Sequence, residues 1–368
     1  MPWKSRWTLD IPQQSLPSFV FNSPTAQLTD KPLLLDADRA EKYWLSKKTY
    51  RLWSQRFAAG LVKAGFQPGD RVLLFSGNTL FFPVVFMGVI MAGGVFTGAN
   101  PTYVARELAY QLKDSGAKFL ITSEAGLQTS LEAIKSINFP QDKVFLFDSG
   151  YDTFDGKGKG QQGVEHWSNL LASPAEGEKF QWTEVTTPEQ FDSTICLNYS
   201  SGTTGVPKGV MITHRNYISN TKQVIHMGEL VPNYQERRQD ARYLGFLPFY
   251  HAYGQTYFCV GCPVRDTPVY IMKKFDFLKF LEIIQKYKIT DLTLVPPIAV
   301  LLAKHPDVKK YDLSSVLTVG SGAAPLGREV SAEVENLWSD GSVNLKQVRF
   351  SFHLSPKQDT NNNTRGGV

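Results

Sequence analysis

Ile195–Met211 reads ICLNYSSGTTGVPKGVM, and this stretch sets the expectations for the rest of the chain. It opens with residues that favour a strand, continues with seven residues drawn only from Tyr, Ser, Gly and Thr, and carries Lys208 shortly afterwards. Gly202 and Gly205 allow the backbone to approach an anion closely. Backbone N–H groups in such a turn form an anion-binding concavity, and a lysine adds a point charge for a phosphate oxygen. The pattern predicts a phosphate-binding loop with hydroxyl donors from Ser200, Ser201, Thr203 and Thr204.

A surface turn rich in Ser and Gly, followed by an ordinary lysine, is the alternative interpretation of the same residues. The strand-forming residues before the turn, Pro207 at its exit and the apolar residues after Lys208 favour the phosphate loop. The stretch is not a Walker A loop, because Gly202 is not followed by Gly-Lys-Ser/Thr at the required spacing.

The composition is that of an ordinary soluble enzyme. Of the 368 residues, 42% are hydrophobic and 20% are charged, and the net charge of +5 is spread along the chain without a cluster typical of nucleic-acid binding. Three cysteines form an odd and sparse set, which indicates a reducing compartment. Cys259 and Cys262 form an isolated CxxC pair, for which we expect a packing role; a redox or metal-binding role is the alternative.

Segments that favour strands alternate with segments that favour helices, and this alternation predicts an α/β fold with a parallel, doubly wound sheet. Residues 149–178 are polar and rich in Gly, so we expect a subdomain connection or a surface loop there. We expect helices at 49–64, 105–115, from 214 onward, near 253, at 277–287 and at 298–303, and strands at 71–75, 118–122, 241–247, 268–272, 291–295 and 315–319.

Leu80–Ala99 is uncharged, mostly apolar and long enough to span a bilayer. It contains Pro83 and several glycines and ends in residues that favour a strand. We therefore expect a buried helix followed by a buried strand, with a membrane span as the alternative.

The order SSGTTGVPKG resembles the phosphate loop of the adenylate-forming superfamily of AMP-dependent synthetases and ligases. This superfamily includes acyl-CoA synthetases, 4-coumarate:CoA ligases, luciferases and the adenylation domains of peptide synthetases. Two further stretches, AGGVFTGANPTYVARELAYQLKDSGAK and PPIAVLLAKHPDVKKYDLSSV, are similar to 4-coumarate:CoA ligases and their fungal relatives. The resemblance covers residues 1–347 and implies an AMP-binding N-terminal domain of doubly wound mixed sheets in stacked α/β layers. It implies that ATP is bound by Ser200, Ser201, Gly202, Thr203, Thr204, Gly205 and Lys208.

Pro248–Gly254 reads PFYHAYG and follows an expected strand, at the edge where open α/β sheets bind ligands. From the residues alone, a histidine among aromatic rings is also common as a core or wall residue. The resemblance implies that His251 orients the carboxylate substrate and the phosphate side of the adenylate, and that Lys208 and His251 are the catalytic residues. Tyr253 then forms a wall of the acyl pocket.

Val319–Pro325 reads VGSGAAP, but it is not a dinucleotide-binding GxGxxG, because Pro325 occupies the third glycine position. The resemblance implies that this loop lines the acyl-adenylate pocket, with Ala323 and Gln347 in contact with the substrate. Lys274 stands where the similar ligases contact CoA, and a surface lysine is the alternative. No metal ligand is assigned.

After Gln347 the similar enzymes continue with Gly-Tyr-Gly-Met-Thr-Glu, whose Glu helps to hold Mg²⁺. Here residues 348–368 read VRFSFHLSPKQDTNNNTRGGV, an aperiodic tail for which we expect disorder. The C-terminal domain with its assisting lysine is also missing, so we expect either a truncated gene product or a gene model that read through an intron. No targeting signal is found, so the expected location is cytoplasmic, or peroxisomal in a longer form.

The resemblance implies an AMP-forming acyl- or aryl-CoA ligase that uses ATP, Mg²⁺ and CoA and is weak or inactive as this chain alone. A non-catalytic protein that binds a nucleotide or an acyl group is the alternative. The partners are a small carboxylic acid, ATP and CoA, with neither nucleic acid nor a membrane span. The acid stays open, because aromatic propenoic acids and medium to long fatty acids both fit.

Overall fold

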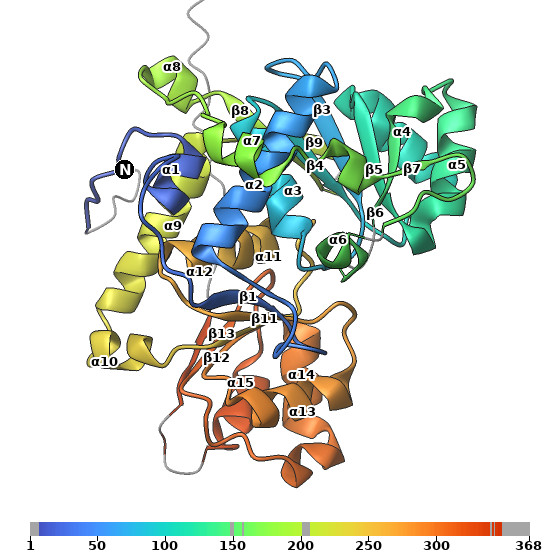
Figure 1. Ribbon diagram of the computed structural model, residues 1–368. Coiled ribbons are helices and arrows are strands. Elements are labelled where there is room, and N and C mark those ends of the chain that lie inside the picture. Colours follow the sequence, from blue (N-terminus) through green and yellow to red (C-terminus); the bar gives the residue numbers. More distant parts are fainter. Residues whose placement is uncertain are drawn as a thin grey trace, which may run out of the picture.

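The computed structural model describes residues 7–147, 151–156, 158–200, 207–338, 341 and 343–347. Their strands form two seven-stranded sheets (Figure 1). Sheet A has the order β14-β13-β12-β10-β11-β1-β2, and sheet B has the order β7-β6-β5-β3-β4-β8-β9. Each sheet is parallel except at one edge, where β2 pairs antiparallel with β1 and β9 pairs antiparallel with β8. The expected fold of doubly wound mixed sheets is therefore confirmed.

The strands of both sheets are short. Sheet A contains β1 (Pro32–Asp36), β2 (Trp44–Ser46), β10 (Tyr243–Gly245), β11 (Val269–Ile271), β12 (Asp291–Leu294), β13 (Thr318–Ser321) and β14 (Leu345–Gln347). Sheet B contains β3 (Arg71–Phe75), β4 (Val95–Ala99), β5 (Phe119–Ser123), β6 (Val144–Phe147), β7 (Glu165–His166), β8 (Thr194–Ser200) and β9 (Lys208–Thr213).

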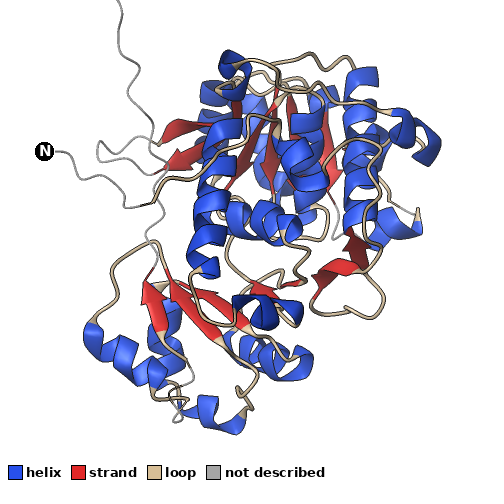
Figure 2. Cartoon of the chain, turned by 90° about the vertical axis from the view of Figure 1, so that its left-hand side faces the viewer, coloured by secondary structure: helices blue, strands red, loops and turns tan. Residues whose placement is uncertain are grey.

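Helices pack against the strands in both halves of the molecule (Figure 2). They are α1 (Leu16–Phe21), α2 (Lys47–Lys63), α3 (Phe82–Met91), α4 (Ala105–Ser115), α5 (Leu127–Ser136), α6 (Tyr151–Asp155), α7 (Pro174–Lys179), α8 (Pro188–Phe191), α9 (His214–Glu229), α10 (Tyr234–Gln239), α11 (Ala252–Gly254), α12 (Cys262–Val264), α13 (Phe277–Tyr287), α14 (Pro296–Lys304) and α15 (Arg328–Glu335). A π-helical turn, Gln255–Gly261, joins α11 to α12, and 3-10 turns lie at Glu124–Gly126, Gln141–Lys143, Trp167–Leu170 and Pro306–Lys310.

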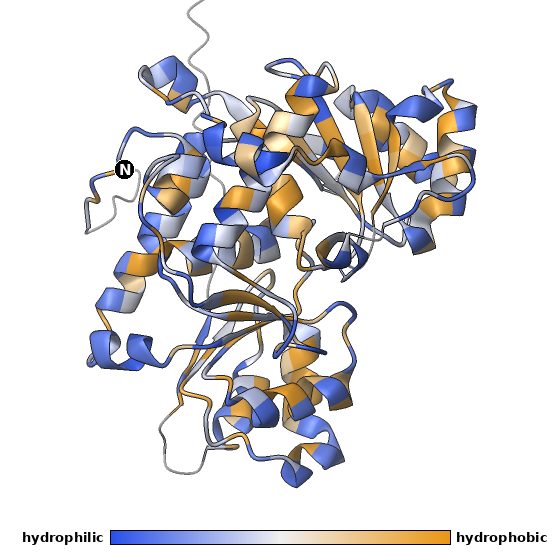
Figure 3. Ribbon diagram, in the orientation of Figure 1, coloured by the Kyte–Doolittle hydropathy of each residue, from blue (hydrophilic) through white to orange (hydrophobic). Residues whose placement is uncertain are grey.

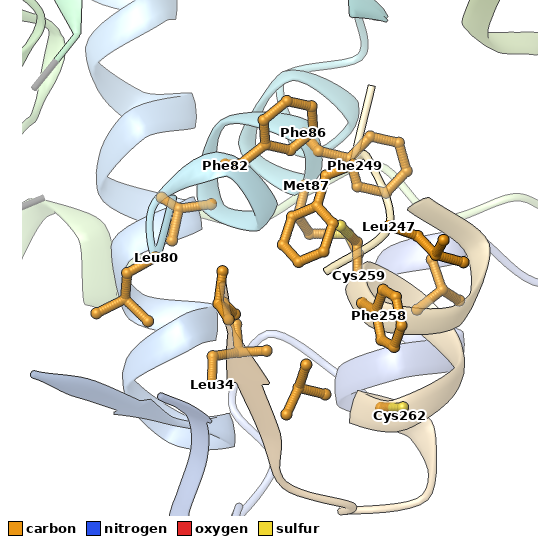
Figure 4. Packing of buried hydrophobic residues seen from close by; sticks show 14 of the residues in the cluster. Leu34, Leu80, Phe82, Phe86, Met87, Leu247, Phe249, Phe258, Cys259 and Cys262 are labelled. Carbon is orange, nitrogen blue, oxygen red and sulfur yellow. The ribbon is translucent and has the colours of Figure 1, made fainter. Parts of the chain in front are cut away.

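Helix α3 lies at the centre of the hydrophobic core, and all of its residues are buried. Phe82 packs edge-on against Phe96 of sheet B and Phe249 from the sheet A side, so the helix joins the two halves. Figure 4 shows the side chains that gather around it, and Figure 3 shows hydrophobic residues along α3 while the outer helix α10 is hydrophilic. Together with β4, this helix confirms the expectation for Leu80–Ala99. None of the helices in the described part of the chain is both long and apolar enough to cross a bilayer.

The cysteines of the CxxC pair lie in this core. Cys259 and Cys262 are buried free thiols, and burial raises the pKa of Cys262 to about 12. A buried neutral thiol behaves as a small apolar side chain, which agrees with the expected packing role. Among the described residues, no group of three or more His, Cys, Asp or Glu side chains could hold a metal ion.

For residues 149–178 we expected a subdomain connection or a surface loop; the Gly-rich residues 158–163 form no helix or strand and are mostly exposed, whereas helices and a strand lie on either side of them. The segment carries α6, β7, a 3-10 turn and α7, and it connects β6 to β7 within sheet B. A large apolar residue follows the Gly-rich centre: Trp167 is fully buried and packs against Phe57, Phe81 and Phe147. The chain passes from sheet A to sheet B through α2, between β2 and β3. It returns to sheet A through α9 and α10, which lie along the left side in Figure 1.

Smaller differences concern single elements. The strand expected at 315–319 begins at Thr318, because pairing with β12 starts there, and the apolar residue Val316 before it is buried without being part of the strand. Helix α1 and strand β9 were not expected. Residues 348–368, expected to be a disordered tail, lie outside the described residues, so the domain boundary after Gln347 stays a prediction.

Side chains from distant parts of the sequence hold helix α1, among them Trp182, whose ring N–H donates to the Ser18 hydroxyl (3.0 Å). The Leu16 N–H of this helix donates to Nδ1 of His214, the first residue of α9, over 2.9 Å. Glu184 accepts from the backbone N–H of Ser15 (2.5 Å) and from the hydroxyl groups of Ser15 and Ser18. Burial opposes ionisation of Glu184, but these hydrogen bonds together with the Val185 N–H lower its pKa below the ordinary value.

Candidate functional site

The expected phosphate loop connects the two strands of the β8–β9 hairpin. Ser200, the last residue of β8, is paired with Lys208, the first residue of β9, and both are exposed. Lys208 forms no ion pair with any described residue. The remaining loop residues named from the sequence lie outside the described residues: Ser201, Gly202, Thr203, Thr204 and Gly205.

His251 lies in a turn that follows β10. Its backbone N–H donates to the Pro248 carbonyl (3.2 Å), and its ring Nδ1 accepts from the N–H of Tyr253 (3.2 Å), which caps α11. The ring is exposed at one side, but the surrounding protein displaces part of its water and lowers its pKa. Since Nδ1 accepts, the neutral ring carries its proton on Nε2, where it can be donated to an anionic oxygen.

Asn78, three residues beyond the end of β3, fixes this turn from the opposite sheet. Its side-chain oxygen accepts from the backbone N–H of Phe249 (2.8 Å). Its amide nitrogen faces three carbonyl oxygens at or just beyond the ends of β10 and β11, those of Leu247 (3.0 Å), Met272 (3.3 Å) and Gly245 (3.5 Å). Asn78 is buried, so one amide both joins the two sheets and determines the path of the chain just before His251.

The histidine turn also lies against the strands that lead to the phosphate loop. A Cβ atom on Gly98 of β4 would lie 2.9 Å from Cβ and 3.0 Å from Cα of Tyr250, so only glycine permits this approach. The side-chain nitrogen of Asn198, on β8, donates to Oε1 of Gln255 over 3.2 Å. These contacts place the hairpin and the histidine turn next to each other.

The third loop, after β13, contacts the aromatic residue predicted to line the acyl pocket. A Cβ atom on Gly322 would lie 2.8 Å from the ring and hydroxyl of Tyr253, so the absence of a side chain at Gly322 makes room for the tyrosine. Ala323, the next residue, is exposed and has a φ of 71°, a left-handed conformation that is unfavourable for an alanine. Such strain in a surface loop is typical of a site that is shaped for a ligand.

Gln347 is predicted to contact the substrate, and its side chain forms hydrogen bonds with the Leu326 backbone. Its amide nitrogen donates to the Leu326 carbonyl (3.0 Å), and its oxygen lies 3.3 Å from the Leu326 N–H. Gln347 therefore holds the loop that carries Ala323, and contact with the substrate stays a prediction.

We expect Gln347→Ala to lower the free energy of unfolding by about 1–2 kcal/mol, because both hydrogen bonds to Leu326 are lost. Hydrogen exchange of the Leu326 amide should become faster, as measured by mass spectrometry. Lys346→Ala, at the neighbouring exposed position of β14, is the matched control and should leave the exchange rate unchanged. An unchanged rate in the Gln347 variant would contradict the anchoring role.

Lys274 and its neighbour Lys273 differ sharply. Lys273 contacts the buried carboxylate of Asp36 (3.1 Å) and the hydroxyl of Tyr151 (2.5 Å). Lys274 is exposed and forms no ion pair with the described residues. A contact between Lys274 and CoA stays a prediction.

A family model for AMP-binding enzymes matches residues 21–347. The chain belongs to this family. A 4-coumarate–CoA ligase of Petroselinum crispum is 35% identical to this chain over 310 residues, which cover 84% of the chain and 52% of that enzyme. A phenylacetyl-CoA ligase of Aspergillus niger is 31% identical over 340 residues, 92% of the chain and 60% of that enzyme. The chain thus spans little more than half the length of these two relatives.

The fold comparison agrees with the family assignment. A luciferase-like enzyme from the nonluminescent Zophobas morio mealworm has a TM-score of 0.75 to this chain at 18% identity, covering 92% of the chain and 72% of that structure. The likeness shows that the two proteins share the fold expected from the sequence.

The structure also assigns roles to residues that had none from the sequence: Asn78, Asn198 and Gln255. Asn78 and Asn198 are polar residues at or just beyond the carboxyl ends of strands, which is a usable signal for a ligand-facing edge. Gln255 lies four residues after His251 on a π-helical turn, an element often found at functional sites. No local pattern reveals which distant groups these side chains contact.

Proposed function

We propose that this chain provides the ATP- and acid-binding half of an AMP-forming acid–CoA ligase. The observation that carries the proposal is the convergence of three loops: the Ser200–Lys208 hairpin, the His251 turn and the loop of Gly322 and Ala323. The contacts Asn198 to Gln255 and Tyr253 to Gly322 link them. Membership of the AMP-binding family supports a nucleotide as the ligand.

In the proposed reaction, a carboxylate oxygen of the acid attacks the α-phosphorus of ATP, and the bond to pyrophosphate breaks. The acyl-AMP then reacts with the thiol of CoA, which displaces AMP, forms the thioester and releases a proton. Lys208 and the Ser200 hydroxyl bind phosphate oxygens, while Nε2–H of His251 donates to an oxygen where negative charge gathers. The protein acts mainly by holding the two reactants in line.

ATP and CoA are the proposed co-substrates, and Mg²⁺ is proposed to arrive on the phosphates of ATP and to neutralise part of their charge. An aromatic carboxylic acid is the first candidate substrate, because the named relatives include ligases of 4-coumarate and phenylacetate. The Tyr253 ring is suited to pack against an aromatic acyl group.

Calorimetric titration with MgATP tests the nucleotide site. Lys208→Ala should weaken ATP binding about 10-fold or more, because one charge-assisted hydrogen bond to phosphate is lost. Lys118→Ala removes the same charge from an exposed position beside β5 and should bind ATP like the unmodified chain. Failure of the unmodified chain to bind ATP would refute the nucleotide site.

Pyrophosphate release with a panel of aromatic and fatty acids tests the reaction. Release above the level of the Lys208 variant with any acid supports a ligase. ATP binding without pyrophosphate release from any acid would contradict a catalytic role for the chain and favour a binding protein.

A further inference from the structure

Helix α4 contacts both strands of the hairpin that carries Ser200 and Lys208. The hydroxyl of Tyr110 donates to the carbonyl oxygen of Pro207, the residue before Lys208, over 2.9 Å. Asp114, one turn further along α4, accepts from the hydroxyl of Tyr199, the residue before Ser200, over 2.6 Å. The two contacts therefore fix the residues that immediately precede the paired site residues.

The helix that provides these two groups is itself firmly attached to sheet B. Leu108 and Leu112 are fully or almost fully buried in the cluster formed with the strands of that sheet. Gln111, also buried, donates to the Thr97 hydroxyl (2.9 Å) and to the Gly98 carbonyl (3.1 Å) of β4. One face of α4 is thus anchored in the core, while Tyr110 and Asp114 reach the hairpin.

The hairpin is shaped to bring Tyr199 to the helix. Tyr199 is paired with Gly209 across the two strands, and a Cβ atom on Gly209 would lie 3.2–3.3 Å from the tyrosine ring. The ring therefore lies across the bare backbone of Gly209. A tyrosine hydroxyl that donates to a carboxylate over 2.6 Å makes a short, charge-assisted hydrogen bond, which is stronger than a neutral one.

We propose that Tyr110 and Asp114 are positioning residues that hold the Ser200–Lys208 pair in place for phosphate binding; this inference rests on the proposed ATP site. Without them, the ends of β8 and β9 keep the pairing of Ser200 with Lys208 and the contact of Asn198 with Gln255, but they lose their attachment to α4. Lys208 and Ser200 are then held less firmly relative to the histidine turn. ATP then has to order the hairpin when it binds, which weakens its affinity.

An electrostatic role and a positioning role of Asp114 predict opposite effects of Asp114→Ala on ATP affinity, so this substitution distinguishes them. Asp114→Ala removes a negative charge near the expected phosphates, so a purely electrostatic role predicts tighter ATP binding. Positioning predicts binding about 3- to 10-fold weaker, the loss expected for one hydrogen bond, and the same for Tyr110→Phe. Asp114→Asn keeps an acceptor for Tyr199 without the charge and should bind ATP at least as tightly as the unmodified chain.

Calorimetric titration with MgATP and thermal unfolding are measured on the same samples. The midpoint of unfolding should stay nearly constant, because Asp114 is exposed and Tyr110 is partly exposed. Glu132→Ala removes an exposed carboxylate of α5 that also accepts a side-chain hydrogen bond, from Gln128, and serves as the matched control. The double variant Tyr199→Phe, Asp114→Ala should bind ATP no more weakly than either single variant, because both substitutions remove the same hydrogen bond.

The results separate this inference from the proposed function. Unchanged or tighter ATP binding in Asp114→Ala, with Tyr110→Phe also unchanged, overturns the positioning role while the ATP site stands. If the unmodified chain fails to bind ATP, the proposed function fails, and anchoring is judged from hydrogen exchange of the β9 amides. Exchange should then be faster in Asp114→Ala and Tyr110→Phe but not in Asp114→Asn; equal rates in all variants overturn the anchoring as well.

Discussion

Asn78→Ala should lower the free energy of unfolding by about 3–5 kcal/mol, because the Phe249 N–H and up to three carbonyl groups lose a partner inside the protein. Asn78 is buried and joins the end of β3 in sheet B to the ends of β10 and β11 in sheet A. Urea unfolding followed by circular dichroism measures the loss. Asn169→Ala, which removes an exposed amide bonded to Glu165, should change stability by less than about 0.5 kcal/mol.

Asn78→Asp tests whether stability depends on the side-chain oxygen, which accepts a hydrogen bond, or on the side-chain nitrogen, which donates. The carboxylate still accepts from Phe249, but it places a negative charge beside carbonyl oxygens and has no hydrogen to donate to them. We expect a loss at neutral pH at least as large as for alanine, partly recovered in mild acid where the carboxyl group gains a proton. Equal stability of the aspartate variant and the unmodified chain would contradict the bridge between the sheets.

Acid should destabilise the chain through His214. Burial lowers the pKa of His214 from 6.5 to about 4, with Glu184 acting in the opposite direction. Between these two pH values the unfolded chain binds a proton that the folded chain does not, so stability falls as the pH drops from 6.5 toward 4. The difference between the two pKa values corresponds to a loss of about 3 kcal/mol, complete near pH 4.

Urea unfolding at several pH values between 7.5 and 4 tests this effect. His214→Gln removes the titrating group, so its stability should depend less on pH over this range than that of the unmodified chain. His305→Gln, which removes a partly exposed imidazole at the end of α14, serves as the control. Parallel curves for the unmodified chain and His214→Gln would show that the contact with Leu16 does not control acid stability.

Helices with both a periodic apolar pattern and a capping residue could be predicted from the sequence with the correct bounds. Helix α4 has the expected bounds, because its apolar positions recur at helical spacing and Gly116 ends it with a φ of 61°. Helix α13 also has the expected bounds, and the Asp276 side chain caps its first turn. Strand β13 begins later than expected, since a buried apolar residue such as Val316 looks the same in sequence whether or not its backbone is paired.

The loop sequence predicts Lys208 and Ser200 as phosphate ligands, and the aromatic turn predicts His251 as a substrate-orienting residue; these roles stay predictions. The contacts that hold these residues could not be predicted from the sequence. The groups that hold these residues in place, such as Asn78 and Asp114, act on partners far away in sequence, and such contacts leave no local pattern. The hydrogen bonds of Gln347 to the Leu326 backbone likewise had no signal in the sequence, and its contact with the substrate stays a prediction.

The order of the strands has a consequence for how this chain folds. Sheet B is encoded by one continuous stretch, from β3 to β9, so its contacts can form while the chain is still being synthesised. Sheet A cannot close in that way, because β1 pairs with β11, as in Leu34 with Val269, across the whole of that stretch. Until β11 emerges from the ribosome, the edge of β1 opposite β2 lacks the strand with which it pairs in the native sheet. Pairing across so long a sequence separation slows folding, so we expect sheet A to form after sheet B.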